Sequence, residues 1–278
     1  MAETKYLYRY MGNKLKHVYS VLVKNQLYFP SPKKFNDPFD CATTVSFSDA
    51  EEDVLQRYYH HLMKAKYEKR GIARTDAQIK EEAEYGIARV KHRNEEWLNK
   101  CTYEIKKEIK EFGKKLRIFC LTEKPKNILM WSHYSNKHKG ILLQFDRNVM
   151  VNENWERSCF PVSYKSGFPS IEEYMKCVDS ENYLDFANLF YCRKAKCWEY
   201  EYEWRIFIQV KNKNDEKLIN PPNGLLTGIV FGCKTSNKFK KQIKDWNSLR
   251  KYPLKIYYAE QSAGSFNLII TSEDGERL

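Results

Sequence analysis

Several features that would place the protein in a familiar class are missing from its 278 residues. No apolar run is long enough to cross a membrane, and the start, MAETKYLYRYMGNKLKHVYS, is too polar for a secretory signal. Glycine and proline are scarce, at 11 and 9 residues, which argues against a disordered chain. The eight cysteines are scattered, and without an export signal we expect reduced thiols. We therefore expect a folded, cytoplasmic protein.

The short motifs of several enzyme classes are missing too. The sequence has no GxxxxGK[ST] phosphate loop, no GxGxxG dinucleotide fingerprint and no GxSxG nucleophile elbow. His133 and His138 are five residues apart, as are Cys192 and Cys197, whereas two ligands on one helix face would be four apart. These absences argue against a P-loop NTPase, a Rossmann dehydrogenase and a zinc site, and we expect no bound metal.

Positive charge and aromatic side chains are present in excess. The net charge is +12, from 48 Lys and Arg against 36 Asp and Glu, and aromatic residues make up 15% of the chain. A basic protein favours anionic partners such as nucleic acid or a dinucleotide. An anionic membrane surface would suit the charge too, and a lysine-rich composition can equally serve solubility alone, because the basic residues are spread along the chain. Of these partners we expect RNA or DNA, and no membrane.

Hydrophobic periodicity predicts an α+β fold. The composition becomes highly charged with helical spacing at about 49–115, which predicts a helical insertion into a single catalytic domain spanning 1–278. Alternating or short apolar runs predict strands at 5–11, 27–32, 116–123, 140–146, 160–165, 202–210, 225–233, 253–261 and 266–273. Helical spacing predicts further helices at 13–26, 127–136, 170–178, 181–195 and 236–250.

Four blocks mix polar and aromatic residues in a way that the other segments do not: 7–10, 27–40, 119–146 and 197–207. The last contains Glu199, Glu201 and Glu203 at every second position, which in a strand would place three carboxylates on one face. Ion pairing within the fold, for example of Arg9 or Arg205 with Glu201, would explain any one of these residues. Polar groups beside aromatic ones cost desolvation energy unless they meet partners, so the four blocks together predict a site.

The same blocks resemble a bacterial domain family of unknown function, whose members share an LYxY start, an FNDPFD turn, an MWxHY segment followed by HxG, and a WxYExEWR block. This resemblance spans nearly the whole chain apart from the helical insertion. A looser resemblance is to the ADP-ribosyltransferase fold of bacterial toxins that modify nucleic acids, which implies a split β-sheet core. In that fold, Arg9 would match the polar residue of an early strand, and Glu203 the glutamate of a late strand.

The second resemblance implies an activity with NAD as substrate. Glu203 would bind the ribose 2′-hydroxyl and stabilise the positive charge that develops as nicotinamide leaves, and Glu201 would activate the acceptor or take the place of Glu203. Arg9 would hold the pyrophosphate. The remaining NAD contacts would come from polar and aromatic residues of the blocks: Tyr10, Tyr28, Ser31, Phe35, Asn36, Asp37, Thr122, Trp131, His133 and Tyr134. Modification of RNA or DNA would make the protein a toxin or antiviral-defence effector, with an antitoxin protein as a further partner.

Two other functions remain open. Asp37, Glu201 and Glu203 would bind magnesium in a metal-dependent nuclease, which EDTA would inhibit. A non-enzymatic nucleic-acid-binding or sensor module would instead stack bases on its aromatic residues, with binding that depends steeply on salt.

Overall fold

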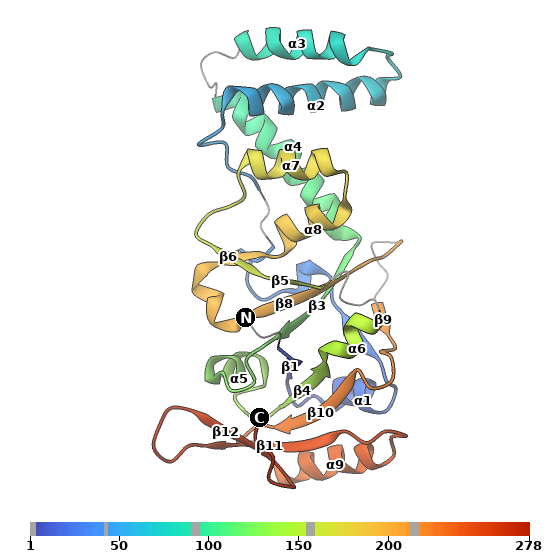
Figure 1. Ribbon diagram of the computed structural model, residues 1–278, viewed down its shortest axis with the longest axis vertical. Helices are drawn as coiled ribbons and strands as arrows, with labels where there is room; N and C mark the ends of the chain where they lie inside the picture. The colour runs from blue at the N-terminus through green and yellow to red at the C-terminus, as the bar shows by residue number, and fades with distance from the viewer. Residues whose placement is uncertain (1–3, 42–43, 90–94, 154–158, 212–216) are drawn as a thin grey trace. The chain divides into compact units, whose positions relative to one another are not determined.

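The chain divides into two compact units (Figure 1). The computed structural model describes residues 4–41, 44–89, 95–153, 159–211 and 217–278. The sheet unit comprises residues 1–35, 115–162 and 196–278, and the helical unit comprises residues 36–114 and 163–195. Helices and a large mixed sheet are both present, so the α+β class is confirmed. Across the described ranges, no helix has both the length and the apolar character that crossing a membrane requires.

The sheet unit is built on one eight-stranded sheet with the order β12-β11-β10-β4-β1-β3-β8-β5. Its strands are β1 (Tyr6–Met11), β3 (Leu116–Thr122), β4 (Ile141–Asp146), β5 (Cys159–Pro161), β8 (Glu203–Gln209), β10 (Leu226–Phe231), β11 (Lys255–Gln261) and β12 (Leu268–Ser272). Strands β10 and β11 are parallel, and the other neighbours are antiparallel. A separate two-stranded sheet pairs β2 (Leu27–Phe29) with β9 (Lys217–Ile219).

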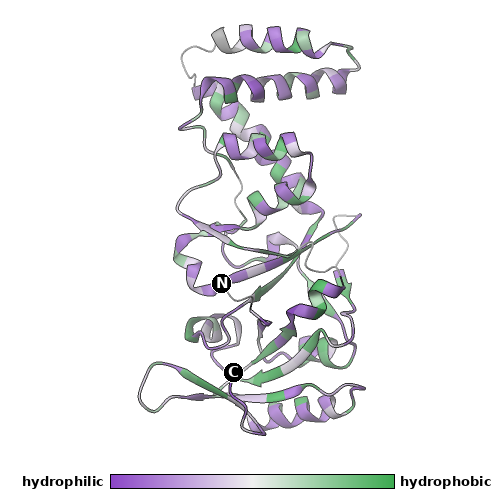
Figure 2. Cartoon of the chain, in the orientation of Figure 1, coloured by the Kyte–Doolittle hydropathy of each residue, from purple (hydrophilic) through white to green (hydrophobic). Residues whose placement is uncertain are grey.

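Helices cover both faces of the large sheet. The helical segments of this unit are α1 (Leu15–Leu22), η1 (Pro32–Lys34), α5 (Ile128–Tyr134), α6 (Arg147–Asn152), η3 (Lys196–Glu201) and α9 (Asn237–Ser248). Alternation along β1 divides the core: Leu7 packs in a cluster with α1 and α9, whereas Tyr8 and Tyr10 pack in another with Met130 and Trp131 of α5. Figure 2 shows the apolar residues concentrated on central strands such as β4 and β10.

The helical unit contains α2 (Glu52–Arg70), α3 (Asp76–Arg89), α4 (Glu95–Lys114), α7 (Ile171–Ser180) and α8 (Tyr183–Tyr191), with β6 (Ser163–Lys165) parallel to β7 (Arg193–Ala195). The first three helices form where the sequence predicts a helical insertion, and α2 and α3 are mostly hydrophilic (Figure 2). Buried aromatic rings form the core of the unit: Tyr58 and Tyr174 contact each other edge to face, and Tyr174 packs on Phe190.

A seam opens in the large sheet between β1 and β3. Strand β1 pairs with β4 along its whole length, from Tyr6 to Met11, but in the described part of the chain it meets β3 at the single pair Tyr8–Thr122. Farther along β3, the amide of Ile118 donates instead to the carbonyl of Pro30. Side chains and loops can therefore enter the sheet at this point.

One local prediction about the acidic segment is wrong. Glu199 and Glu201 lie in the 3-10 helix η3, and β8 begins at Glu203, so the three carboxylates do not share a strand face. Tyr202 has a left-handed backbone with φ of 45°, which separates the helical turn from the strand. Glu199 is exposed, whereas Glu201 and Glu203 are buried. The sequence also did not predict α6, β7, β9 or the 3-10 helices.

Candidate functional site

Glu203 and Arg205 form a buried ion pair at the start of β8. Being two residues apart on one strand, they face the same side, and Nε and Nη2 of Arg205 donate to the two carboxylate oxygens of Glu203 at 2.8 and 2.9 Å. Arg205 is fully buried, Glu203 is 6% exposed, and the guanidinium lies 5.2 Å from the centre of the Phe35 ring. This bidentate geometry fixes the carboxylate firmly.

Glu201 is buried beside the same part of the sheet. The hydroxyl of Tyr134, at the end of α5, donates to Oε1 of Glu201 at 2.7 Å, and Glu201 itself is 2% exposed. The hydroxyl of Thr122 donates to the backbone carbonyl of Glu201, and Thr122 is in register with Glu203 across β3 and β8. The two carboxylates are thus held by three different segments: β3, α5 and β8.

Arg9 reaches this region from the face of β1 that is opposite to Tyr8 and Tyr10. Alternation places its side chain away from Tyr8 and Tyr10, with the guanidinium 4.3 Å from the centre of the Phe119 ring. Its Nη1 donates across the seam to the carbonyl of Cys120 at 2.8 Å. Burial lowers the pKa of Arg9, against the attraction of Glu203. Burial, followed by the charge of Glu203, raises the pKa of the Cys120 thiol well above its usual range.

A shallow pocket of about 520 Å³ is lined by the two chain neighbours of Glu201, although the side chains of Glu201 and Glu203 are not part of its lining. Its walls come from the loop 123–127 and from Tyr200 and Tyr202, the two neighbours of Glu201. Lys124 lies 4.1 Å from the centre of the ring of Tyr202, which is 48% exposed. Lys126 adds a second positive charge to the lining, and Glu123 adds a negative one. No individual role was predicted for these residues, although the basic loop EKPKN between a predicted strand and a predicted helix was a signal.

Side-chain hydrogen bonds hold the loop 123–127 in place. The hydroxyl of Tyr10 donates to the carbonyl of Lys124 at 2.6 Å, and Nε1 of Trp131 donates to that of Pro125 at 2.8 Å. Asn127 caps α5 and also donates to the carbonyl of Tyr200 at 2.8 Å. The two walls of the pocket are therefore tied to each other and to the sheet.

Three residues predicted to bind NAD are core residues instead. Trp131 is fully buried, packed edge to face on Tyr10 and stacked on His138, so it is not free to stack on a nicotinamide ring. Thr122 is 1% exposed, and its hydroxyl accepts from the amide of Lys124 while it donates to Glu201. The hydroxyl of Tyr10 is committed to the carbonyl of Lys124. Their polar groups form hydrogen bonds with the loop 123–127 and with the carbonyl of Glu201.

Other predicted residues of the sheet unit have separate surroundings. His133 is exposed on α5, with its ring 6.4 Å from that of Trp198. Tyr28 lies on β2 and accepts from Nζ of Lys34 at 2.7 Å. Ser31 precedes η1 without a side-chain hydrogen bond to that helix. Phe35 is connected to the carboxylates through Arg205, and His133 through the ring of Tyr134.

Asn36 and Asp37 belong to the helical unit. Asn36 is exposed, and Oδ1 of Asp37 accepts from the amide of Phe39 at 2.9 Å, as in an Asx turn. Asp37 thus shapes the FNDPFD turn. Among the residues that the structure describes, no group of three His, Cys, Asp or Glu side chains could hold a metal ion. Both oxygens of Glu203 accept from Arg205, which favours an ion pair over magnesium coordination there.

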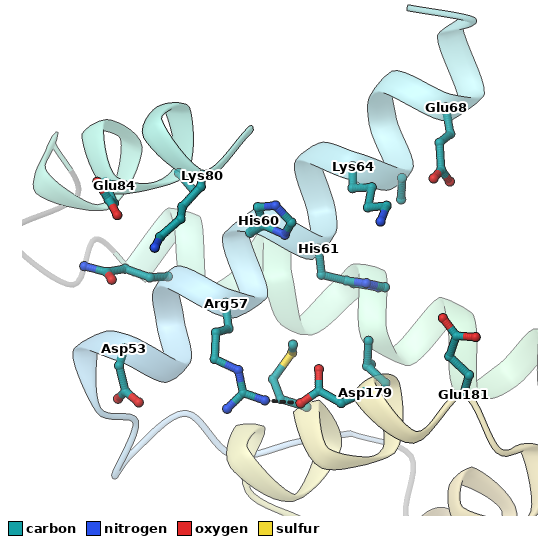
Figure 3. Close-up of a pocket in the computed structure, with 15 residues that line it drawn as sticks. Asp53, Arg57, His60, His61, Lys64, Glu68, Lys80, Glu84, Asp179 and Glu181 are labelled. Carbon is teal, nitrogen blue, oxygen red and sulfur yellow. Dashed lines mark hydrogen bonds and ion pairs between the residues drawn. The ribbon is translucent and has the colours of Figure 1, made fainter. Parts of the chain in front are cut away.

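The helical unit has a larger groove, of about 800 Å³, lined by α2, α3 and α7 (Figure 3). Arg57 of α2 pairs with Asp179 of α7, and both are about half exposed. His60 and His61 lie on α2 among charged residues that include Lys64 and Lys80. Its charged residues are mostly exposed to solvent, and none of the predicted site residues lines it.

Residues 130–206 match the model of a family described as a protein of unknown function, DUF2971. The matched segment runs from α5 to β8, so it contains Tyr134, Glu201 and Glu203. It agrees with the resemblance to an uncharacterised domain family. No curated protein and no solved structure matches the chain.

Proposed function

We propose that the protein is an ADP-ribosyltransferase that uses NAD to modify RNA or DNA. The observation that carries this proposal is the position of two buried carboxylates, Glu201 and Glu203, where η3 leads into β8. Tyr200 and Tyr202, the chain neighbours of Glu201, line a pocket together with Lys124 and Lys126. Such a pocket suits a dinucleotide: lysines attract the pyrophosphate, and exposed tyrosine rings stack on bases. The volume of the pocket lies within the usual range for ligand sites.

The two carboxylates take different roles in this proposal. Both oxygens of Glu203 accept from a guanidinium, so much of its negative charge is neutralised and it acts in positioning β8. The oxygen of Glu201 accepts from a neutral donor, Tyr134. Because its chain neighbours Tyr200 and Tyr202 line the pocket, we assign to Glu201 the contact with the ribose 2′-hydroxyl and the stabilisation of the positive charge that develops as nicotinamide leaves. Tyr134 is partly exposed at the end of α5, and rotation of its side chain would uncover Glu201.

The NAD-binding residues are reassigned in the same way. Lys124 and Lys126 replace Arg9 as the residues that hold the pyrophosphate, and Tyr200 and Tyr202 replace Trp131 as the stacking surfaces. Arg9 keeps an electrostatic role beside Glu203. The net charge of +12 supports a nucleic-acid acceptor. A transferase of this kind would act in the cytoplasm as a toxin or antiviral-defence effector, restrained by an antitoxin protein.

Transfer of label from NAD is the experiment that tests the proposal. The purified protein is mixed with NAD labelled in its adenosine part and with separate bacterial RNA, DNA and protein fractions. We expect label in RNA or DNA, reduced about 100-fold or more in Glu201→Gln. Glu203→Gln should lose activity together with stability, since it weakens the bond to Arg205. Glu199→Gln is the matched control, because this glutamate is exposed and two residues away.

The result that would overturn the proposal is equally concrete. Absence of label from every fraction, together with no NAD binding by calorimetry, would exclude NAD as the donor. Equal labelling by the wild type and Glu201→Gln would remove Glu201 from the reaction. Thermal unfolding of each variant, followed by circular dichroism, separates a loss of chemistry from a loss of fold.

A further inference from the structure

A cysteine, a histidine and a serine meet outside the carboxylate site. Sγ of Cys233, which follows β10, lies 3.7 Å from Nδ1 of His138, in the loop after α5. Nε2 of the same ring lies 3.1 Å from Oγ of Ser132 on α5. Cys233 and His138 are 95 residues apart in the sequence. The sequence therefore suggested none of this arrangement, and the carboxylate site does not use it.

The hydrogen bonds determine which nitrogen of His138 carries the proton. The hydroxyl of Ser132 donates to the carbonyl of Ile128 at 3.0 Å, so its single hydrogen is already used. Oγ of Ser132 is then placed to accept from Nε2–H of the neutral ring, and this tautomer leaves the lone pair of Nδ1 facing the thiol of Cys233. The chain Cys233–His138–Ser132 is thus a directed relay in which His138 can take the thiol proton.

The surroundings favour the neutral imidazole that this relay needs. The ring of His138 stacks on the buried indole of Trp131, with centres 6.2 Å apart and planes inclined by 12°. Burial and the nearby charge of Lys234 lower the pKa of His138. A base that is unprotonated near neutral pH is available to accept a proton.

The backbone holds His138 in an unusual conformation. Asn136, Lys137 and His138 have φ of 47°, 56° and 67°, three consecutive non-glycine residues in the left-handed region. The amide of His138 donates to the carbonyl of Trp131, and the carbonyl of His138 accepts from the amide of Lys234. At Gly232, any Cβ would clash with that carbonyl, so glycine is required for the two loops to approach. Strain of this kind is often retained at functional sites.

The relay opens into a pocket of about 590 Å³. Cys233 and His138 both line it, together with residues 261–268, which connect β11 to β12. Lys234 is the lining residue with a permanent charge, so the pocket is positive. Phe266, between β11 and β12, is fully exposed. A small molecule with negative charge would thus reach the thiol easily.

From this geometry we propose that Cys233 is a reactive thiol, activated by His138 and Ser132, that undergoes exchange with small anionic disulfides. The thiol proton passes to Nδ1 of His138, and the thiolate attacks one sulfur of the disulfide. A new bond forms between Sγ of Cys233 and that sulfur while the original S–S bond breaks. The departing thiolate takes up the proton from His138, so Cys233 is oxidised and the disulfide is reduced.

Glutathione disulfide is the probe, and peptide mass mapping measures its addition to each cysteine over time. Cys197 is exposed and serves as an internal reference within the same molecule. We expect Cys233 to react at least about tenfold faster than Cys197 near neutral pH. His138→Asn, chosen because asparagine tolerates the left-handed backbone, should lower this ratio about tenfold. Lys234→Gln should slow the reaction with glutathione disulfide but not with the cationic disulfide cystamine.

A ratio near one in the wild type would overturn the proposal, as would an unchanged ratio in folded His138→Asn. If that variant does not fold, Ser132→Ala provides the test. It retains the imidazole but removes the acceptor that fixes the proton on Nε2, so the ratio should fall. An unchanged ratio in Ser132→Ala would exclude the relay. If Lys234→Gln slows the reactions with glutathione disulfide and with cystamine equally, the proposed preference for anionic disulfides is wrong.

Discussion

At the scale of single residues, the orientation of each side chain depends on details that spacing does not reveal. Glu199, Glu201 and Glu203 have the spacing of a strand face, but the left-handed residue Tyr202 places the first two in a helical turn. The sequence allowed a second explanation of these residues, an ion pair of Arg9 or Arg205 with Glu201. The structure shows that Arg205 binds Glu203. Which of two nearby glutamates an arginine binds depends on the strand boundary, and the sequence does not mark it.

The Glu203–Arg205 pair gives a prediction about stability. Arg205→Met leaves a buried carboxylate without its cation, so we expect the free energy of unfolding of the sheet unit to fall by about 3–5 kcal/mol. Lys244→Met is the control, because the pair Lys244–Glu273 is 44% and 57% exposed and should contribute less than about 1 kcal/mol. Urea unfolding followed by tryptophan fluorescence measures both. Equal losses in the two variants would contradict a special role for burial.

At the scale of elements, local signals were enough to predict most helices and strands. The helix predicted at 127–136 forms as α5, and Asn127 caps it, since its Oδ1 accepts from the amides of Leu129 and Met130. The pocket was not predictable, because its walls come from segments more than 70 residues apart that meet through the order of β3 and β8 in the sheet. The short strands β7 and β9 carry too few residues for periodicity to be detected.

Substitutions of Asn127 separate two contributions to stability: the cap of α5 and the hydrogen bond to the carbonyl of Tyr200. Asn127→Ala removes both the cap and the hydrogen bond to the carbonyl of Tyr200, and we expect a loss of about 1–2 kcal/mol. Asn127→Asp keeps an acceptor for the cap but removes the donor, so it should cost about 1 kcal/mol. The free energies of unfolding of the two variants decide this. A loss in Asn127→Asp as large as in Asn127→Ala would show that the cap contributes nothing.

At the scale of the whole molecule, two sets of residues that interleave in the sequence form two cores. The sheet unit draws on three separate segments and the helical unit on two. The helical insertion was predicted from the charge of residues 49–115, but α7 and α8 belong to the same unit and come much later in the chain. A single catalytic domain therefore stays a prediction. Separate cores imply that local stability is lost separately in each unit.

Amide hydrogen exchange in two cap variants tests this independence. Ser170→Ala removes the capping box of α7 in the helical unit, and Ser236→Ala removes the cap of α9 in the sheet unit. Each loss is worth about 1 kcal/mol, so exchange of the slowest amides should rise roughly fivefold in the unit that carries the substitution. The amides of the other unit should keep their wild-type rates. If either variant accelerates exchange to the same extent in both units, the chain opens as one cooperative body, because stability lost at one cap is then shared by both cores.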